Sequence, residues 1–492
     1  MTHAPKRSHL LVATVFSASL LGLCLAIALP FVLAPTEYVF FSLNLALVQL
    51  VTSVAFEWIR VSILRHAGGD QTGDRPARGD IRSLFTIMVL LLLLLAAVLG
   101  TLSIWMAELQ TPALVCATAA AQGMFDGRSA WARATFDNLR LSIAAFARPV
   151  LSLAVVVALA FLTRSGAWAL VGLCVSYLLA SLFFGDRPSG MLVLTRLDRS
   201  RALSLLRFGT MAALGTNIAM AVPAALRSVL VVVLGSSAAG GALLALDISQ
   251  RVFSTMGMSL NLLNFQTLVH TFDNRPIQDA GRHARAAIAV EVALFAGIVV
   301  ALGAAAAPVG ALLAPASYQQ DFARHLPLIA LLMAILCLRQ YAIDPLFIAC
   351  RRVAFIAVAP AVTLALFGLS LLATHTGLVA REHLYVLLVA AGAAGFVLPF
   401  VFVRGFLPGA IPFDALLASG IAAACAVALT NGVGVSTPIL DLMLRGAASL
   451  GVYGAVLAVL ALLQQLWRWW RAPLLPAPAD DARSDRDSPT RI

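Results

Sequence analysis

The sequence predicts an all-α polytopic membrane protein with about fourteen transmembrane helices. Of its 492 residues 61% are hydrophobic and 12% are charged, whereas soluble domains average roughly 45–50% apolar and about 25% charged residues. The apolar runs are continuous, and many reach the roughly 20 residues that a helix needs to cross a bilayer. They do not alternate as in a membrane β-barrel. This composition excludes a soluble enzyme and a nucleic-acid-binding protein.

Apolar runs bounded by charged residues, glycine or proline mark the candidate spans. In chain order they cover residues 10–33, 38–63, 84–106, 111–127, 149–163, 167–184, 208–234, 239–265, 286–307, 326–349, 353–373, 383–403, 411–430 and 438–466. The fourth and fifth spans have the least definite ends, because residues 128–148 between them are amphipathic.

Basic residues predict the orientation, since cytoplasmic loops are enriched in arginine and lysine. With the N-terminus inside, 27 of the 34 basic residues fall in inner segments, three in outer segments and four within spans. We therefore expect both termini in the cytoplasm. The longest inner link, 185–207, is expected to be a basic cytoplasmic linker. It divides the chain into an N-terminal lobe (1–184), a C-terminal lobe (208–403), two additional spans (404–466) and a disordered tail (467–492).

The eighth span carries the clearest polar face, with residues that recur at intervals of three and four, as one side of a helix requires. They are Asp247, Gln250, Arg251, Ser254, Thr255, Met258 and Asn261. Two interpretations stay open. The length of the face favours the wall of a hydrated cavity. The alternative is an Asp247–Arg251 pair at i,i+4 with ordinary polar packing between helices.

The second span has a similar polar arc, made of Ser42, Gln49, Thr52, Ser53, Glu57 and Arg60. Its charged residues lie near the cytoplasmic end. They are therefore explained either by a cavity mouth or by side chains that reach back to the interface.

The seventh and tenth spans place arginines far from either membrane surface, where a charge costs roughly 2.5–3.5 kcal/mol on insertion scales. In the seventh, Asn217 and Arg227 flank Pro223, which frees a backbone carbonyl. Arg227 is expected in a cavity or in a structural ion pair with Asp247, and both can hold. In the tenth, Arg339 and Asp344 are five residues apart, which predicts that they lie on different faces of a regular helix.

Other embedded charges are expected to be structural: Asp126 and Glu291 near inner ends, and an i,i+4 pair of Asp441 with Arg445. The sequence has no P-loop, HExxH or GxSxG motif, and its histidines and cysteines show neither metal-ligand nor disulfide spacing. We expect neither an enzyme nor a bound metal or cofactor.

The layout resembles the multidrug/oligosaccharidyl-lipid/polysaccharide (MOP) exporter superfamily, and within it the bacterial Wzx-type polysaccharide flippases. The resemblance covers nearly the whole chain. It rests on the fourteen spans and on three segments: VTSVAFEWIRVSILR (51–65), GRSAWARATFDNLRLSIAAFARPV (127–150) and RFGTMAALGTNIAM (207–220). The stretch after the seventh span, LGSSAAGGALLALDISQ, is looser than the turn usual in that family.

This resemblance implies a MATE- and MurJ-like fold, with two six-helix lobes around a cavity lined by the first, second, seventh and eighth helices. It implies movement of a polyprenyl-diphosphate-linked oligosaccharide across the bacterial inner membrane, with polysaccharide polymerase and glycosyltransferases as partners. Arginine suits bidentate phosphate contact, and the candidates are Arg227, Arg251 and Arg339, with Arg60 at the cytoplasmic mouth. Asp247, Glu57 and Asp344 are the candidates for coupling to a proton or sodium gradient or to the membrane potential. Gln49, Asn217 and Asn261 complete the expected polar lining.

Three other functions are alternatives to a polysaccharide flippase. A cation-coupled drug or metabolite antiporter predicts a cavity rich in carboxylates and aromatic residues. A peptidoglycan-precursor flippase predicts the same cationic cavity, since its cargo also carries a diphosphate. A membrane-embedded glycosyltransferase or polymerase requires large outer loops with acidic residues, and the longest outer loop, about 308–325, offers only Asp321.

Overall fold

The computed structural model is all-helical over the residues that it describes, which are 8–66, 75–135, 137–184, 192–194, 197–236, 238–274, 276–350, 352–407, 409–430 and 437–471. The helices are α1 (Ser8–Val32), α2 (Pro35–His66), α3 (Arg75–Leu102), η3 (Ala107–Leu109), α4 (Gln110–Ala134), α5 (Asn138–Thr163), α6 (Gly166–Leu182), α7 (Arg199–Leu234), α8 (Ala239–Asn274), α9 (Ile277–Ala304), α10 (Ala306–Leu313), α11 (Gln319–Leu338), η5 (Arg339–Ile343), α12 (Asp344–Ala349), η6 (Val353–Ala357), α13 (Val358–His375), η7 (Arg381–His383), α14 (Leu384–Phe406), α15 (Phe413–Thr430) and α16 (Pro438–Arg471).

The all-α membrane fold is confirmed. Every predicted span corresponds to a long helix, with α11, η5 and α12 together forming the tenth. Among the described residues, ten helices are long and apolar enough to cross a membrane, and two shorter apolar helices lie at Phe16–Val32 and Gly166–Leu182. The helices α4 and α8 are not among these twelve.

Several helices continue beyond their predicted apolar spans, and at α5, α7 and α16 this changes the predicted organisation of the chain. The helix α5 begins at Asn138 rather than at 149, and α7 begins at Arg199, so residues 199–207 do not belong to a linker. Asp137 caps α5 by accepting from the N–H of Arg140 at 3.3 Å, and Asp198 caps α7 by accepting from the N–H of Ser200 at 2.9 Å. Such caps satisfy backbone donors that a helix start leaves free. The helix α16 extends to Arg471; the rest of the predicted tail, 472–492, lies outside the described residues.

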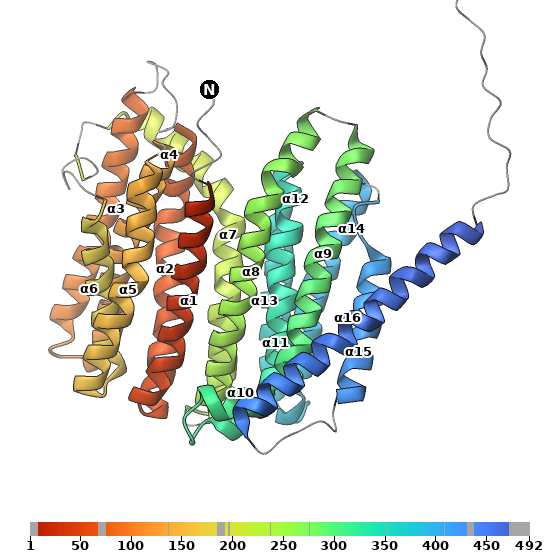
Figure 1. Ribbon diagram of the computed structural model, residues 1–492. Helices are drawn as coiled ribbons and strands as arrows, with labels where there is room; N and C mark the ends of the chain where they lie inside the picture. The colour runs from red at the N-terminus through yellow and green to blue at the C-terminus, as the bar shows by residue number, and fades with distance from the viewer. Residues whose placement is uncertain are drawn as a thin grey trace, which may run out of the picture.

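The first six helices meet the rest of the molecule mainly along α1 and α2. In Figure 1 the helices α1–α6 lie on one side, α9 and α11–α16 lie on the other, and α7 and α8 run between them. The helix α2 packs along α7, and α1 packs against both α5 and α8. The division of the chain into two lobes at 185–207 stays a prediction.

One glycine allows the backbones of α2 and α7 to approach closely. A Cβ atom at Gly209 of α7 would lie 2.5 Å from the carbonyl oxygen of Trp58 in α2, which is a backbone atom and cannot turn aside. Small residues at helix contacts allow this close approach in membrane proteins.

We therefore predict that Gly209→Ala lowers the free energy of unfolding by about 1–3 kcal/mol, the usual cost of overpacking. Gly446→Ala in α16 is the matched control, because a Cβ there meets no atom within 4 Å. Thermal unfolding of the two purified variants measures the difference. Equal midpoints for both variants would contradict the close approach of α2 and α7.

Candidate functional site

A central cavity of about 510 Å³ lies where α1, α2, α7 and α8 meet, and α4, α5, α6 and the α11–α12 segment complete its wall. Its lining is mixed, with both apolar and polar side chains. The charged residues that line it are Glu57, Arg60, Asp126, Arg148, Arg251, Arg339 and Asp344. The helices named in the sequence analysis therefore do share one cavity, together with other elements.

Gln49, Glu57 and Arg60 of α2 all line this cavity, as expected. Arg60 Nη2 lies 2.6 Å from Glu57 Oε1, and the side chain of Arg60 is 45% exposed, against 11% for Glu57. The pair is therefore a half-exposed group at the edge of the cavity. Since Arg60 remains accessible, both earlier explanations, a cavity mouth and an interfacial side chain, apply to it.

The predicted separation of Arg339 and Asp344 is wrong. Residues Arg339–Ile343 form one turn of π-helix, and Arg339 Nη1 lies 3.4 Å from Asp344 Oδ2. In a π-helix, residues five apart are neighbours, whereas in an α-helix they lie on different faces. Both side chains are buried and both line the cavity. Such single π-turns occur frequently at functional sites.

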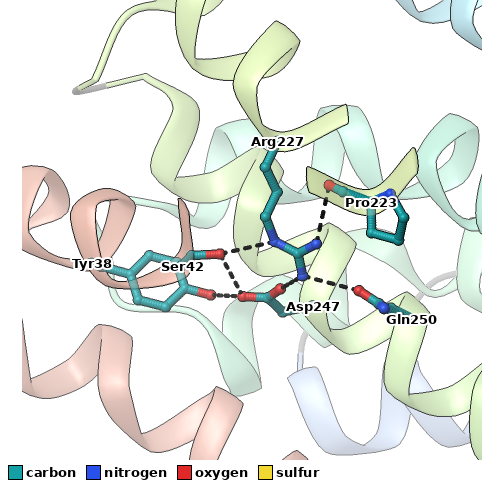
Figure 2. A network of polar contacts seen from close by, with 6 residues as sticks. All are labelled: Tyr38, Ser42, Pro223, Arg227, Asp247 and Gln250. Atoms are coloured by element: carbon teal, nitrogen blue, oxygen red, sulfur yellow. Dashed lines mark hydrogen bonds and ion pairs between the residues drawn. The ribbon is translucent and has the colours of Figure 1, made fainter. Parts of the chain in front are cut away.

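Arg227 lies in a buried polar network rather than in the cavity lining (Figure 2). Its Nη2 atom contacts Asp247 Oδ1 at 2.6 Å and donates to Gln250 Oε1 at 2.9 Å. Nε donates to Ser42 Oγ at 3.3 Å, and Nη1 donates to the Pro223 carbonyl oxygen at 3.3 Å. The structural ion pair with Asp247 is therefore present, and the alternative pairing of Asp247 with Arg251 is not found among the described residues.

The same network ties α2 to α7 and α8. The Tyr38 hydroxyl donates to Asp247 Oδ2 at 2.7 Å, and the Ser42 hydroxyl donates to the same oxygen at 3.1 Å. Both residues lie in the first part of α2, while Arg227 lies near the end of α7. By the predicted orientation this is the outer half of the molecule, so the network joins the two sides of the cavity on its outer side.

Arg251 lines the cavity without a counter-ion. No described residue forms a salt bridge or hydrogen bond with its guanidinium group. The group lies against α1, where a Cβ atom at Gly22 would be 3.0 Å from Nη1. It interacts repulsively with Arg148 of α5. The guanidinium carbon of Arg148 lies 5.5 Å from the centre of the Phe125 ring and 6.0 Å from that of Tyr177, within the range of cation–π contact.

Sequence reasoning missed Arg148 as a cavity residue. It was assigned to an inner segment because the fifth span was expected to begin at 149, but α5 begins eleven residues earlier. Asp126, expected to be structural, also lines the cavity and interacts electrostatically with Arg148. The amphipathic pattern of residues 128–148 was the signal that could have placed the end of α4 after 127 and the start of α5 before 149.

The two predicted asparagines lie elsewhere. The side-chain oxygen of Asn217 accepts from the Ser53 hydroxyl at 2.7 Å and so joins α7 to α2. Asn261 lines a second, much smaller cavity of about 30 Å³ between α8, α9 and the π-turn. Arg445 Nε lies 2.8 Å from Asp441 Oδ1, which confirms that predicted pair.

The buried network gives a stability prediction. Asp247→Asn leaves Arg227 without its carboxylate in a buried site, so we expect a loss of about 3–5 kcal/mol in the free energy of unfolding. Asp279→Asn breaks the exposed Asp279–Arg282 pair and should cost about 0–1 kcal/mol. Replacing both buried charges, with Arg227→Met and Asp247→Leu together, should recover part of the loss. Denaturation midpoints measure all three, and an Asp247→Asn loss as small as that of the control would contradict a shared buried pair.

No family model and no curated protein matches this sequence. Solved structures do match the fold. The lipid II flippase MurJ in an inward closed conformation aligns with a TM-score of 0.64 at 11% identity, over 93% of this chain and 100% of MurJ. A MOP superfamily transporter from Pyrococcus furiosus aligns with a TM-score of 0.59 at 13% identity, over 82% and 96%. A MATE protein in a bent conformation aligns with a TM-score of 0.55 at 13% identity, over 86% and 100%. The chain therefore has the fold of MOP transporters.

Proposed function

We propose that this protein is a bacterial inner-membrane transporter of the MOP superfamily that moves a polyprenyl-diphosphate-linked oligosaccharide from the inner to the outer leaflet. The substrate enters the central cavity from the cytoplasmic side, and the two halves of the molecule rock to open it outward. The lipid tail stays in the bilayer, so the cavity needs to hold only the polar head group.

The observation that carries this proposal is the pair of arginines Arg148 and Arg251. They come from α5 and α8, both line the cavity, and they repel each other. Neither forms a salt bridge with a described residue, whereas Arg60 and Arg339 are paired with Glu57 and Asp344. Two like charges in a low-dielectric site are costly. Asp126, which interacts with Arg148, offsets part of that cost, and an anion bound by both arginines would offset more of it.

A diphosphate is the anion that best matches this arrangement. It offers several oxygens to two guanidinium groups, each of which can make bidentate contacts. The further polar lining, which includes Gln122, Tyr177 and Gln250, supplies hydrogen-bonding groups for sugars. The cavity volume of about 510 Å³ lies within the roughly 300–1,000 Å³ of ligand sites in general.

A cation antiporter fits this cavity less well. Of the seven charged residues in the lining four are arginines, and two of the three carboxylates are already held by arginine. An organic cation would meet repulsion from Arg148 and Arg251, and Asp126, the lining carboxylate without a salt bridge to a described residue, already interacts with Arg148.

A peptidoglycan-precursor flippase is the second candidate, and the extent of the alignment with MurJ favours it, since it covers 93% of this chain. The diphosphate would bind the same two arginines in both cases. The two candidates differ only in the attached sugar, which the following experiment identifies.

Lipid-linked sugars from a strain that lacks the gene would be analysed by mass spectrometry, with their sidedness probed by a periplasmic enzyme. We expect a complete oligosaccharide repeat unit to accumulate on the cytoplasmic side. Accumulation of the peptidoglycan precursor would support the second candidate. Unchanged lipid-linked sugars with raised sensitivity to toxic cations would contradict both and favour the antiporter.

The arginine pair gives a second prediction. Arg251→Gln should slow transport in vesicles by about tenfold to a hundredfold, because a hydrogen bond to a charged group contributes about 1.5–3 kcal/mol. Arg148→Gln should act similarly, and Arg251→Lys should lose less since the charge remains. Arg445→Gln is the matched control, as Arg445 lies outside the cavity lining. Full activity of both glutamine variants would contradict a cationic binding site.

A further inference from the structure

Glu291 of α9 is a buried carboxyl group for which no described residue provides a hydrogen bond or ion pair. It is 4% exposed, and its Oε1 atom has no hydrogen-bond partner. No described residue forms a salt bridge with it. Five other carboxylates on the long helices have an arginine nearby: Asp247 with Arg227, Asp344 with Arg339, Glu57 with Arg60, Asp441 with Arg445, and Asp126 near Arg148.

An isolated carboxylate in such a site is not stable as an anion. Moving an ionised carboxylate from water into an apolar environment costs far more than moving the neutral acid, so the group neutralises instead. Glu291 is therefore a place where the protein binds a proton. Ionisable residues within membrane spans commonly mark ion or proton pathways.

The small cavity of about 30 Å³ lies directly beside Glu291. His283, two turns earlier on α9, lines the same cavity, and its Nε2 atom also has no hydrogen-bond partner. The amide groups of Asn261 and Asn264 complete the polar part of the lining. A volume above roughly 10–15 Å³ with two to four polar partners can hold a water molecule.

Tyr341 separates this small cavity from the central one. It belongs to the π-turn and lines both cavities. Its ring packs on α8, where a Cβ atom at Gly257 would lie 2.4 Å from Cδ2. The same turn carries Arg339, which faces the central cavity beside Asp344. Tyr341 therefore contacts the small cavity beside Glu291 on one side and the central cavity on the other. A change in the charge of Glu291 can act on the central cavity through this side chain.

The other groups around α9 offer no competing charge. On α11, Cys337 is the nearest titratable side chain. On α16, the Tyr453 hydroxyl is used in donating to the Ala293 carbonyl oxygen at 2.7 Å. On α15, Asp414 is held by Arg285 at 2.7 Å and by Gln464. The helix α10 contains no titratable residue, and α8 contributes only amides to the polar lining of the small cavity.

We propose that Glu291 binds the proton that couples transport to the proton gradient, and that Tyr341 and the π-turn transmit its protonation state to the central cavity. The coupling role rests on the proposed function, whereas proton binding by Glu291 does not. This site replaces Asp247, Glu57 and Asp344 as the candidate for coupling, because each of those carboxylates already has an arginine partner.

Infrared spectroscopy of the full chain in lipid tests proton binding without any cargo. At neutral pH we expect an absorption of an un-ionised carboxyl group, which shifts in heavy water and is absent from Glu291→Gln. Glu382→Gln, at an exposed position, is the control and should keep the absorption. Glu291→Leu is a second variant for the case that the amide disturbs packing. An unchanged absorption in Glu291→Gln would overturn the proposal, and so would loss of the absorption on adding sodium at constant pH.

Vesicles containing the purified protein test the coupling, with a short-chain polyprenyl diphosphate as the probe. We expect an imposed pH gradient to accelerate probe movement by the wild-type protein and to leave Glu291→Gln at the same rate with and without the gradient. An equal acceleration in both proteins would overturn the coupling role. Failure of the wild-type protein to move any lipid diphosphate would contradict the proposed function, while the infrared result would still decide the protonation of Glu291.

Discussion

The buried ion pair between Arg227 and Asp247 is the contact on which the arrangement of the central helices depends. It lies between α7 and α8, and hydroxyl groups of Tyr38 and Ser42 bring α2 into the same network. A buried charge that loses its partner is strongly destabilising, so these three helices are held in one relative position while the network is intact. Opening the molecule on this side requires that the contacts with α2 break, so the network favours a closed arrangement here.

The central cavity differs from this network in how its charged residues are paired. The network around Arg227 and Asp247 is paired, whereas Arg148 and Arg251 face one cavity from α5 and α8 without a salt bridge to any described carboxylate. An anionic head group would therefore draw together two helices that repel each other in the empty cavity. Binding of such a head group would favour the conformation in which α5 and α8 lie closer together, which is a direct way for binding to change the balance between two conformations.

The structure departs from the spacing expected of a regular α-helix most clearly at the π-turn. A regular helix would place Arg339 and Asp344 on different faces, and the single inserted turn brings them into contact. Pro345 lacks the N–H that a regular helix would donate to the Tyr341 carbonyl, so the sequence predicts a disturbed turn here without specifying a π-turn. The π-turn also places Tyr341 between the central cavity and the small cavity beside Glu291. This irregular turn therefore connects the two cavities.

The sequence by itself determined the membrane class, the order of the long helices and the polar faces of α2 and α8, because the bilayer imposes a length and a polarity on every span. Only the tertiary structure decided which charges are partners. Asp247 was compatible with Arg251 on its own helix and with Arg227 on the preceding helix, and Arg148 was counted with the cytoplasmic loops, although α5 starts at Asn138. Which charged residues form ion pairs depends on the distances between helices and on where the amphipathic ends of the helices stop. The periodicity of residues within one helix gives no information on either.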